Sequence, residues 1–536
     1  MSSVLDEAPA QLAKDIAQVD DTLFCSDARR GDPLFLSFES RAKRRGIAKT
    51  CFVSAEDFTK RYGAFCKSTS LNTTDTQKYA ISLLQAAFEN QATDVHLIDY
   101  GTYGIIQFRC MGLLRDHTKV HGEFMQKVID VIYSTFGKGG NTTQFVKKQR
   151  QDSRIIDREF LPHEVHSVRI HTEPIEAALA EDGVGTLMAL RLLYDRTEAR
   201  GGLEDRLSVL GYGKKDIEKF HTLTQRTGLT IVSGPTGHGK STLLKHLMEA
   251  QAEKYPQKAY MSIEDPPEYP LANVKQVKVS VNDKDQDPEK RGQEFTKAIA
   301  GAMRSNPDVI MIGEIRYPPA AVAAIDTALT GHGVFTTLHA NNAISIIARM
   351  VSLLNAAQFR DPLEYLCDHN VLAGLTYQRL LPVLCPHCKI PLHSRDRSPE
   401  DMKHLREVLP EKTQARYTQT GHGEDMVHIR GRGCEKCDYL GLIGQTVAAE
   451  VIVTDEHFLR QIHQGHYNKA YNYWLKDMGG RTYIQQAIEG ISQGYLDPYL
   501  TELRLGVPLD FEHGHEEAGS HRAAAIMERN YDDSLY

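Results

Sequence analysis

The chain has 536 residues, which is too long for one ordinary domain and predicts about three to four folding units. Hydrophobic residues make up 41% of it, and the formal net charge of −7 gives no long-range reason to expect nucleic acid as the main partner. The sequence has no run of about eighteen apolar residues and no basic-then-apolar start, so we expect a cytosolic chain, at most peripheral to a membrane.

Residues 1–75 carry the weakest pattern and are interpreted as a region for partner binding or a linker. Acidic and apolar positions alternate around Asp15, Asp20 and Asp21, and we expect a helix there. The basic cluster at 41–45 is interpreted as a solvated helix face, with an acidic partner or a membrane surface as the alternative.

Residues 76–197 are predicted to form a small α/β domain. Helical spacing of apolar residues runs from Thr76 to Phe88, and strand patterns follow at Val95–Ile98 and 105–109. The polar segment Asp195–Gly202 ends in two glycines, as a hinge or interdomain linker requires.

Residues 198–505 alternate between apolar strand patterns and helical patterns up to about residue 380, which is typical of a largely parallel α/β sheet. The polar tail 506–536 is predicted to be disordered.

A phosphate-binding loop is the strongest motif. The stretch from Gly234 to Ser241 fits G-x-x-x-x-G-K-[ST] and lies between an apolar strand pattern and a helical pattern. Lys240 is expected to reach the β- and γ-phosphates, Ser241 to bind Mg²⁺, and the following helix to direct its positive dipole end at the same anion. A glycine-rich turn without a ligand is the alternative. The predicted nucleotide-binding residues are Gly234, Pro235, Thr236, Gly237, His238, Gly239, Lys240, Ser241, Thr242 and Asp265.

Acidic and histidine side chains follow the other predicted strands. Glu264 and Asp265 follow 260–263, Glu314 follows 309–312, and His339 follows 334–338. Because ligands bind outside the carboxyl ends of strands in open α/β sheets, we expect these residues to meet the phosphate loop at one site. The alternatives are helix-capping or ion-paired acids, and a His332 that only closes a helix.

Two C-x-x-C pairs, Cys385 with Cys388 and Cys434 with Cys437, lie downstream. Four thiolates at this spacing predict a closed tetrahedral Zn²⁺ site with a structural role. A redox pair or unrelated thiols are the competing interpretations.

With these motifs in hand, the sequence resembles the secretion ATPase superfamily of type II secretion and type IV pilus assembly, in its tetracysteine-containing assembly branch. The resemblance covers about Thr76 to Gln445. It rests on a Walker A loop at 234–241, an aspartate box at 262–268, a Walker B segment at 306–316 and a histidine box at 329–340.

The resemblance implies a RecA-like P-loop ATPase domain preceded by a smaller PAS-like α/β domain, with a tetracysteine zinc-binding insertion at 380–445. It makes Glu314 the Walker B glutamate and Glu264 a second acid that orients the attacking water. His332 and His339 would couple nucleotide state to the rest of a ring. Related proteins carry an acid directly after Glu-Ile-Arg, where this chain has Tyr317 and two prolines; proline suits the first helical turn, so the fold should persist.

The small domain is similar to the family's second N-terminal domain, with Thr93-Asp-Val-His96 in place of a Ser-Asp-Ile-His sequence. In the family that domain supplies arginines to the nucleotide, and the matching positions are Arg154, Arg169 and Arg191. Surface salt bridging is their alternative role.

The resemblance thus implies a Mg²⁺-dependent, ATP-hydrolysing motor that forms a homo-hexamer and acts on a polytopic inner-membrane platform protein. It would power type IV pilus assembly or type II-like secretion, or a related conjugation machine. Two other classes stay open: a nucleic-acid-dependent RecA-like motor, and a nucleotide-binding scaffold without turnover.

Overall fold

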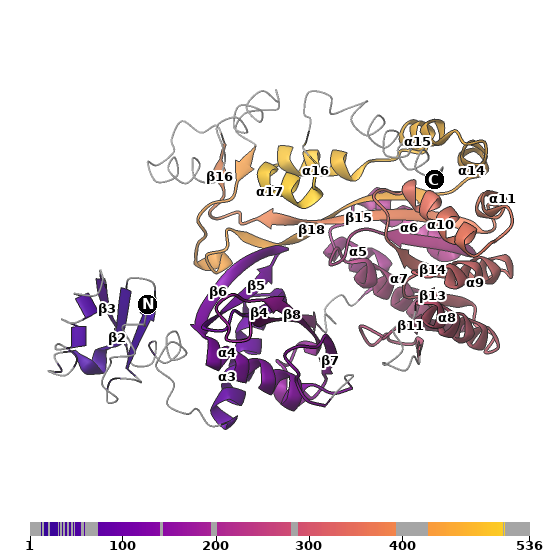
Figure 1. The fold of residues 1–536 in the computed structure, drawn as a ribbon. Helices are drawn as coiled ribbons and strands as arrows, with labels where there is room; N and C mark the ends of the chain where they lie inside the picture. The colour runs from indigo at the N-terminus through magenta and orange to yellow at the C-terminus, as the bar shows by residue number, and fades with distance from the viewer. Residues whose placement is uncertain are drawn as a thin grey trace. The chain divides into compact units, whose positions relative to one another are not determined.

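The structure is a computed structural model. It describes residues 73–139, 143–194, 201–279, 288–392 and 427–507, residue 509, and a discontinuous set between residues 12 and 58. The chain divides into two compact units, Met1–Asp195 and Arg196–Tyr536. The predicted linker lies largely outside the described residues, as does nearly all of the predicted disordered tail. Figure 1 shows the elements of each unit.

The first unit contains a three-stranded sheet of β1 (Ile16–Val19), β2 (Thr22–Ser26) and β3 (Lys49–Val53), with β1 antiparallel and β3 parallel to β2. The expected helix around Asp15–Asp21 is therefore wrong. Burial alternates along most of β2, and half of the residues in the three strands are β-branched or aromatic, which favours a half-buried strand over a helix. Of the basic cluster, Lys43 pairs with Glu39 at 2.7 Å; residues 41, 44 and 45 lie outside the described residues.

A six-stranded antiparallel sheet in the order β6-β5-β4-β9-β8-β7 follows in the same unit. Its strands are β4 (Ala92–Asp99), β5 (Tyr103–Cys110), β6 (Leu113–His121), β7 (Gln151–Ile155), β8 (Val165–Glu176) and β9 (Val184–Tyr194). Helices α3 (Thr73–Glu89) and α4 (Gly122–Asp130), the latter continued by η5 (Val131–Phe136), pack on one face through a shared apolar core.

The second unit is built on a seven-stranded sheet in the order β12-β11-β13-β14-β10-β15-β18. All neighbours are parallel except β15 and β18, which run antiparallel. The strands are β10 (Gly228–Ser233), β11 (Tyr260–Glu264), β12 (Lys275–Lys278), β13 (Val309–Ile312), β14 (Gly333–Leu338), β15 (Leu372–Leu384) and β18 (Leu442–Val453). A two-stranded ribbon of β16 (Ile390–Pro391) and β17 (His428–Ile429) adjoins this sheet in sequence.

Helices cover both faces of this sheet, as its fully buried central strands require. Alternate residues feed two cores: Leu229 and Ile231 of β10 join one, and Val232 joins the other. The first core packs against α8 (Pro288–Met303), α9 (Pro318–Leu329), α10 (Ser345–Ala356) and α11 (Pro362–Leu366). The second packs against α5 (Leu203–Val209), α6 (Lys214–Gln225) and α7 (Lys240–Lys254).

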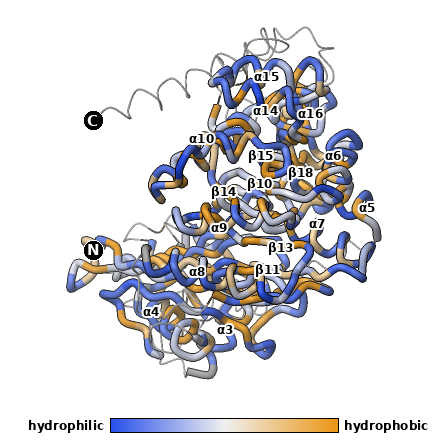
Figure 2. The backbone as a smooth tube through the Cα atoms, turned by 90° about the vertical axis from the view of Figure 1, so that its right-hand side faces the viewer, coloured by the Kyte–Doolittle hydropathy of each residue, from blue (hydrophilic) through white to orange (hydrophobic). Residues whose placement is uncertain are grey.

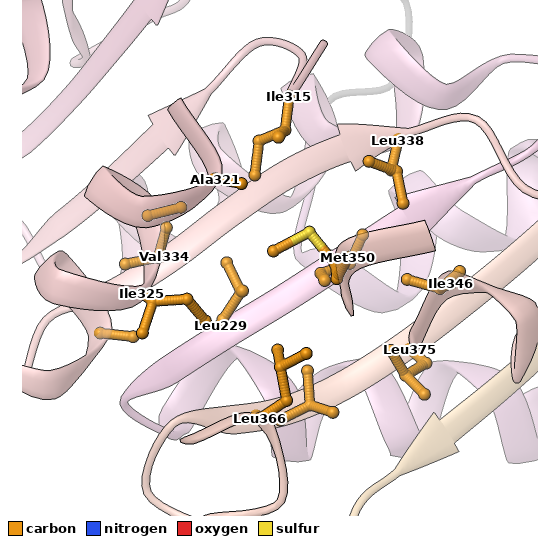
Figure 3. Close-up of a cluster of buried hydrophobic side chains, with 14 of the residues drawn as sticks. Leu229, Ile315, Ala321, Ile325, Val334, Leu338, Ile346, Met350, Leu366 and Leu375 are labelled. Atoms are coloured by element: carbon orange, nitrogen blue, oxygen red, sulfur yellow. The ribbon is translucent and has the colours of Figure 1, made fainter. Parts of the chain in front are cut away.

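Figure 3 shows the first core, where Leu229 and Val334 meet Ile325 of α9 and Met350 of α10. Figure 2 shows the same contrast along the chain: hydrophobic tube follows β13, while hydrophilic stretches mark outer helices such as α15. Helix α9 begins at Pro318 with Tyr317 as its N-cap, so the two prolines lie in its first turn as expected.

The C-terminal helices are α14 (Glu456–His463), α15 (Tyr467–Lys476), α16 (Tyr483–Ser492) and α17 (Pro498–Leu505). Helices α16 and α17 lie over the long β15–β18 pair (Figure 1). Among the described residues, none of the helices has the length and apolar character needed to cross a lipid bilayer.

Candidate active site

The carboxyl ends of β10, β11, β13 and β14 lie at the same edge of the sheet, because these strands are parallel and in register. The structure therefore brings the phosphate loop, Glu264, Glu314 and His339 to one edge. Hydrogen bonds fix this edge: the Ala340 amide donates to Ser233 Oγ at 2.8 Å, and Thr337 Oγ1 donates to the Gly313 carbonyl at 2.7 Å.

The phosphate loop needs glycine where it leaves β10. Gly234 has φ of 150°, and a Cβ there would lie 2.4 Å from the Gln378 carbonyl oxygen of β15. Gly239 has φ of 77° and is the N-cap of α7. Side chains at these positions would push the loop off the sheet or strain its backbone.

Lys240 extends back across the loop, where its Nζ donates to the carbonyl oxygens of Gly234 at 2.7 Å and Pro235 at 3.1 Å. A polyphosphate at the N-terminus of α7 would offer this ammonium stronger, anionic acceptors. Thr236 and Gly237 form the exposed crest of the loop, and Ser241 and Thr242 begin the helix.

Ser241 and Glu264 line the same small cavity of about 20 Å³, together with Lys245 and Gly313. That volume has room for one water or a small hydrated ion. Glu264 is 8% exposed, and its Oε1 accepts from Ser262 Oγ at 2.8 Å and from Gln276 Nε2 at 3.1 Å. These two donors fix one carboxylate oxygen of Glu264 beside the cavity. A hard cation such as Mg²⁺ prefers such hydroxyl, carboxylate and water oxygens, so the residues fit it.

Glu314 is held from both sides at the end of β13. Arg316 Nη2 lies 2.6 Å from its Oε2, and His339 Nε2 lies 3.1 Å from its Oε1. Burial, together with the nearby Lys240 charge, lowers the pKa of His339, so the ring is neutral near pH 7. The Glu314 side chain thus lies between these two groups and is still 22% exposed.

Of the other predicted residues, His332 lies apart from this group, and Asp265 lies at the same edge but has a different partner. His332 precedes β14 at its amino end, and its backbone carbonyl accepts from the Gly228 amide at the start of β10. The six residues of β14 separate it from the phosphate edge by roughly 20 Å. Its ring contacts Thr330 and Thr327, as in a residue that closes α9. Asp265 is at the phosphate edge but faces Arg291 of α8 at 4.0 Å.

The three predicted arginines form a row in the first unit. Arg154 of β7, Arg169 of β8 and Arg191 of β9 are directly opposite one another in register. Residues directly opposite in antiparallel strands share one face. Because Val168, Ile170 and Leu190 belong to the helix-covered core, the arginines occupy the opposite face.

The arginine row continues through two residues that were not among the predicted site residues, although Asp94 lies within the Thr93–His96 motif. Asp94 of β4 pairs with Arg191 at 3.0 Å and with Arg109 of β5 at 3.7 Å. Arg154 donates to Ser167 Oγ at 2.8 Å. Cross-strand register decides these contacts, and spacing along the sequence carries no signal for it.

The four cysteines of the two C-x-x-C pairs come together in the second unit, with all their Sγ atoms within 4.8 Å of one another. The Sγ atoms are 3.9 Å apart in Cys385 and Cys434, and 3.8 Å apart in both Cys388–Cys437 and Cys434–Cys437. Zn–S bonds of about 2.3 Å in a tetrahedron require sulfurs about 3.8 Å apart, so the group fits Zn²⁺.

The environment of Cys437 favours a thiolate. Burial opposes its ionisation, but amide donors from Cys434 and Gly441, each 3.2 Å from Sγ, help to lower its pKa to about 7. His387 lies inside the first pair but is not part of the cluster.

The parallel sheet with its glycine-rich loop, basic residue and acids at one edge defines a P-loop nucleotide-binding protein of the RecA-like type. A family model described as "Type II/IV secretion system protein" matches residues 72–507. The chain belongs to this family, which confirms the resemblance drawn from the motifs.

Individual relatives agree with that assignment. Type II secretion system protein E of Aeromonas hydrophila is 30% identical over 74% of this chain and 69% of its own length. Type IV pilus assembly ATPase PilB of Thermus thermophilus is 27% identical over 73% of this chain, but only 38% of PilB is covered. The X-ray structure of the ATPase DotB of Legionella pneumophila shares the fold, with a TM-score of 0.53 at 17% identity, covering 82% of this chain and 97% of DotB.

Proposed function

We propose that this chain is an ATP-hydrolysing motor that powers type IV pilus assembly or type II-like secretion. The observation that carries the proposal is the meeting of Lys240, Glu264 and Glu314 at one sheet edge, in a chain of the type II/IV secretion family. Phosphoryl transfer needs charge neutralisation and an oriented nucleophile more than covalent chemistry, and these side chains supply both.

Mg²⁺ would be held by Ser241, with Glu264 bound directly or through a water in the small cavity that both residues line. When bound, Mg²⁺ neutralises charge that develops on the β- and γ-phosphates.

The chain's own residues carry the remaining steps. The amides of the loop and α7 bind the polyphosphate, and Lys240 exchanges its carbonyl acceptors for phosphate oxygens. Glu314 accepts a hydrogen bond from the attacking water and orients it, while the contacts with Arg316 and His339 hold that carboxylate in place.

The arginine row supplies a separate cationic surface. Arg154, Arg169 and Arg191 would stabilise charge on the γ-phosphate, as arginine fingers do. Their common row on one face of the six-stranded sheet supports that role, whereas the Asp94 pair favours an ion-pairing role for Arg191.

The wider assembly is proposed from the family resemblance that the motifs carry. We propose a homo-hexamer at the cytoplasmic face of the inner membrane, peripheral to it, that acts on a polytopic platform protein. The tetracysteine group would hold a structural Zn²⁺, since four thiolates leave no position open for substrate.

Phosphate release by the purified chain tests the ATPase proposal. We expect activity with Mg²⁺ that disappears with EDTA, and a loss of about 100-fold or more in Lys240→Ala and Glu314→Gln. Lys258→Ala and Glu218→Gln change exposed residues away from the site and should retain activity. Equal turnover in all four variants would show that the site is misassigned.

The ligand that stimulates ATP hydrolysis distinguishes a secretion motor from a nucleic-acid motor. A secretion motor should be activated by phospholipid vesicles or a platform-protein fragment and be indifferent to added DNA or RNA. Activation by nucleic acid alone would support the rival class.

A further inference from the structure

His238 lies inside the phosphate loop, but its side chain leaves the loop. It is 5% exposed and lies against β15 and the C-terminal helix α17. The proposed catalytic steps make no use of it. An ordinary histidine titrates near pH 6.5, so a buried histidine in a phosphate loop is a potential source of pH sensitivity.

The loop rests on an open edge of β15. Strand β10 ends where Ser233 pairs with Tyr377, and β15 runs on to Leu384. Beyond that point the loop takes over the pairing edge: Gln378 Nε2 donates to the His238 carbonyl at 2.6 Å, and the Leu380 amide donates to His238 Nδ1 at 2.8 Å. The imidazole thus satisfies a backbone donor that has lost its neighbouring strand.

Both ring nitrogens of His238 face donors. Leu380 N–H faces Nδ1, and Arg504 Nη2 of α17 lies 3.2 Å from Nε2. A neutral imidazole has one acceptor nitrogen and an imidazolium has none. The Leu380 amide is fixed in the strand, so Nδ1 is the acceptor and Nε2 carries the hydrogen of the neutral ring. Arg504 therefore acts on the ring through its charge rather than through a hydrogen bond, and protonation would set Nδ1–H against the Leu380 amide.

The charged groups that face His238 are all cations. Lys240 approaches from α7, Arg379 from β15 and Arg504 from α17. Burial is the largest cause that lowers the pKa of His238 to about 3, and the charges of these three cations lower it further. Arg379 in turn donates to the Arg504 carbonyl at 3.3 Å, which ties α17 to the same strand.

We propose that Arg504 is a positioning residue for the phosphate loop: its guanidinium holds His238 neutral, and neutral His238 anchors the loop on β15 through the Leu380 amide. Arg504 acts through His238 and does not touch the nucleotide. The inference rests on the proposed function, since it concerns the same nucleotide site. Through Arg504, helix α17 would thus help to keep the phosphate loop in place for nucleotide binding at acidic pH.

Binding of methylanthraniloyl-ADP to the full chain, followed by fluorescence from pH 8 to pH 4, tests this role. At pH 4 the dissociation constant of Arg504→Gln should exceed that of the wild type about twofold, because about one unit of pKa recovered by His238 would leave roughly half of the rings protonated there. Arg504→Lys keeps the charge and should restore the wild-type profile. Arg460→Gln, an exposed arginine of α14, is the matched control.

His238→Asn shows whether Arg504 acts through the ring, since the Asn oxygen can take the Leu380 amide but cannot be protonated. In that background, Arg504→Gln should add no acid-dependent loss. A wild-type profile for Arg504→Gln, or the same loss with and without His238, would overturn the inference.

Melting temperatures of the nucleotide-free chain give a second readout. The drop in melting temperature from pH 8 to pH 4 should be smaller in Arg504→Gln, because the folded-state pKa of His238 moves toward its unfolded value. An unchanged drop counts against the inference. Failure of the wild type to bind the ADP analogue at pH 8 contradicts the proposed function instead, and the melting data then decide the role of Arg504.

Discussion

Removing two thiolates from the tetracysteine group should abolish zinc binding. The double variant Cys385→Ser, Cys434→Ser deletes one ligand from each C-x-x-C pair, and hydroxyls replace the sulfurs. Three Sγ separations of 3.8 to 3.9 Å within the group agree with the value of about 3.8 Å that a tetrahedral Zn–S₄ site requires. The cluster therefore needs little rearrangement to bind the metal.

The free energy of zinc binding is large compared with the stability that the short ribbon beside the cysteines can have by itself. Structural zinc sites in small domains supply roughly 10 kcal/mol at pH 7. Here β16 and β17 have two residues each, and so short a ribbon is not stable alone. Loss of zinc should loosen this region, while the sheet of the second unit retains its own two cores.

Metal analysis of the purified chain is the direct assay, with limited proteolysis as the structural readout. We expect about one zinc per chain in the wild type, almost none in the double variant, and faster cleavage near β16 and β17. Cys367→Ser changes a cysteine outside the cluster and should retain the metal. Full zinc content in the double variant would refute the site.

Two further predictions concern stability. The Arg206 side chain is 6% exposed and contacts Glu249 at 2.9 Å and Glu253 at 2.6 Å. Arg206→Ala leaves a buried carboxylate without its partner, so it should lower the free energy of unfolding of the second unit, measured in urea, by about 3 kcal/mol or more. Arg460→Ala is the control, and equal urea midpoints for Arg206→Ala and the wild type would contradict the ion-pair argument. Burial lowers the pKa of His246 to about 4, so below pH 6.5 the unfolded chain binds more protons than the folded chain. The free energy of unfolding should therefore fall from pH 6.5 toward pH 4, and His246→Asn should make that fall smaller. An unchanged dependence of the unfolding free energy on pH would exclude His246 as its source.

Sequence reasoning succeeded where local pattern decides the structure. The buried runs at 229–233, 260–263, 309–312 and 334–338 became parallel strands, because continuous apolar segments between helices can be covered only on both faces. The phosphate loop and the clustering of the cysteines followed from residue types at fixed spacing.

It failed where long-range register decides the contacts. The partnership of Asp94 with Arg191 joins residues 97 positions apart, and that of His238 with Arg504 joins residues 266 apart. No periodicity along the chain encodes either pair. The N-terminal helix was expected because short apolar segments fit both periods; neighbouring strands decided the outcome.

Strand β15 has a consequence for mechanical transmission. It spans 13 residues, about 43 Å, and is paired along nearly all of that length with β18. Gln378, near its middle, holds the His238 carbonyl, while Cys385 follows its last residue. A displacement of the phosphate loop would therefore be transmitted to Cys385 through a continuous, hydrogen-bonded strand rather than through a flexible loop.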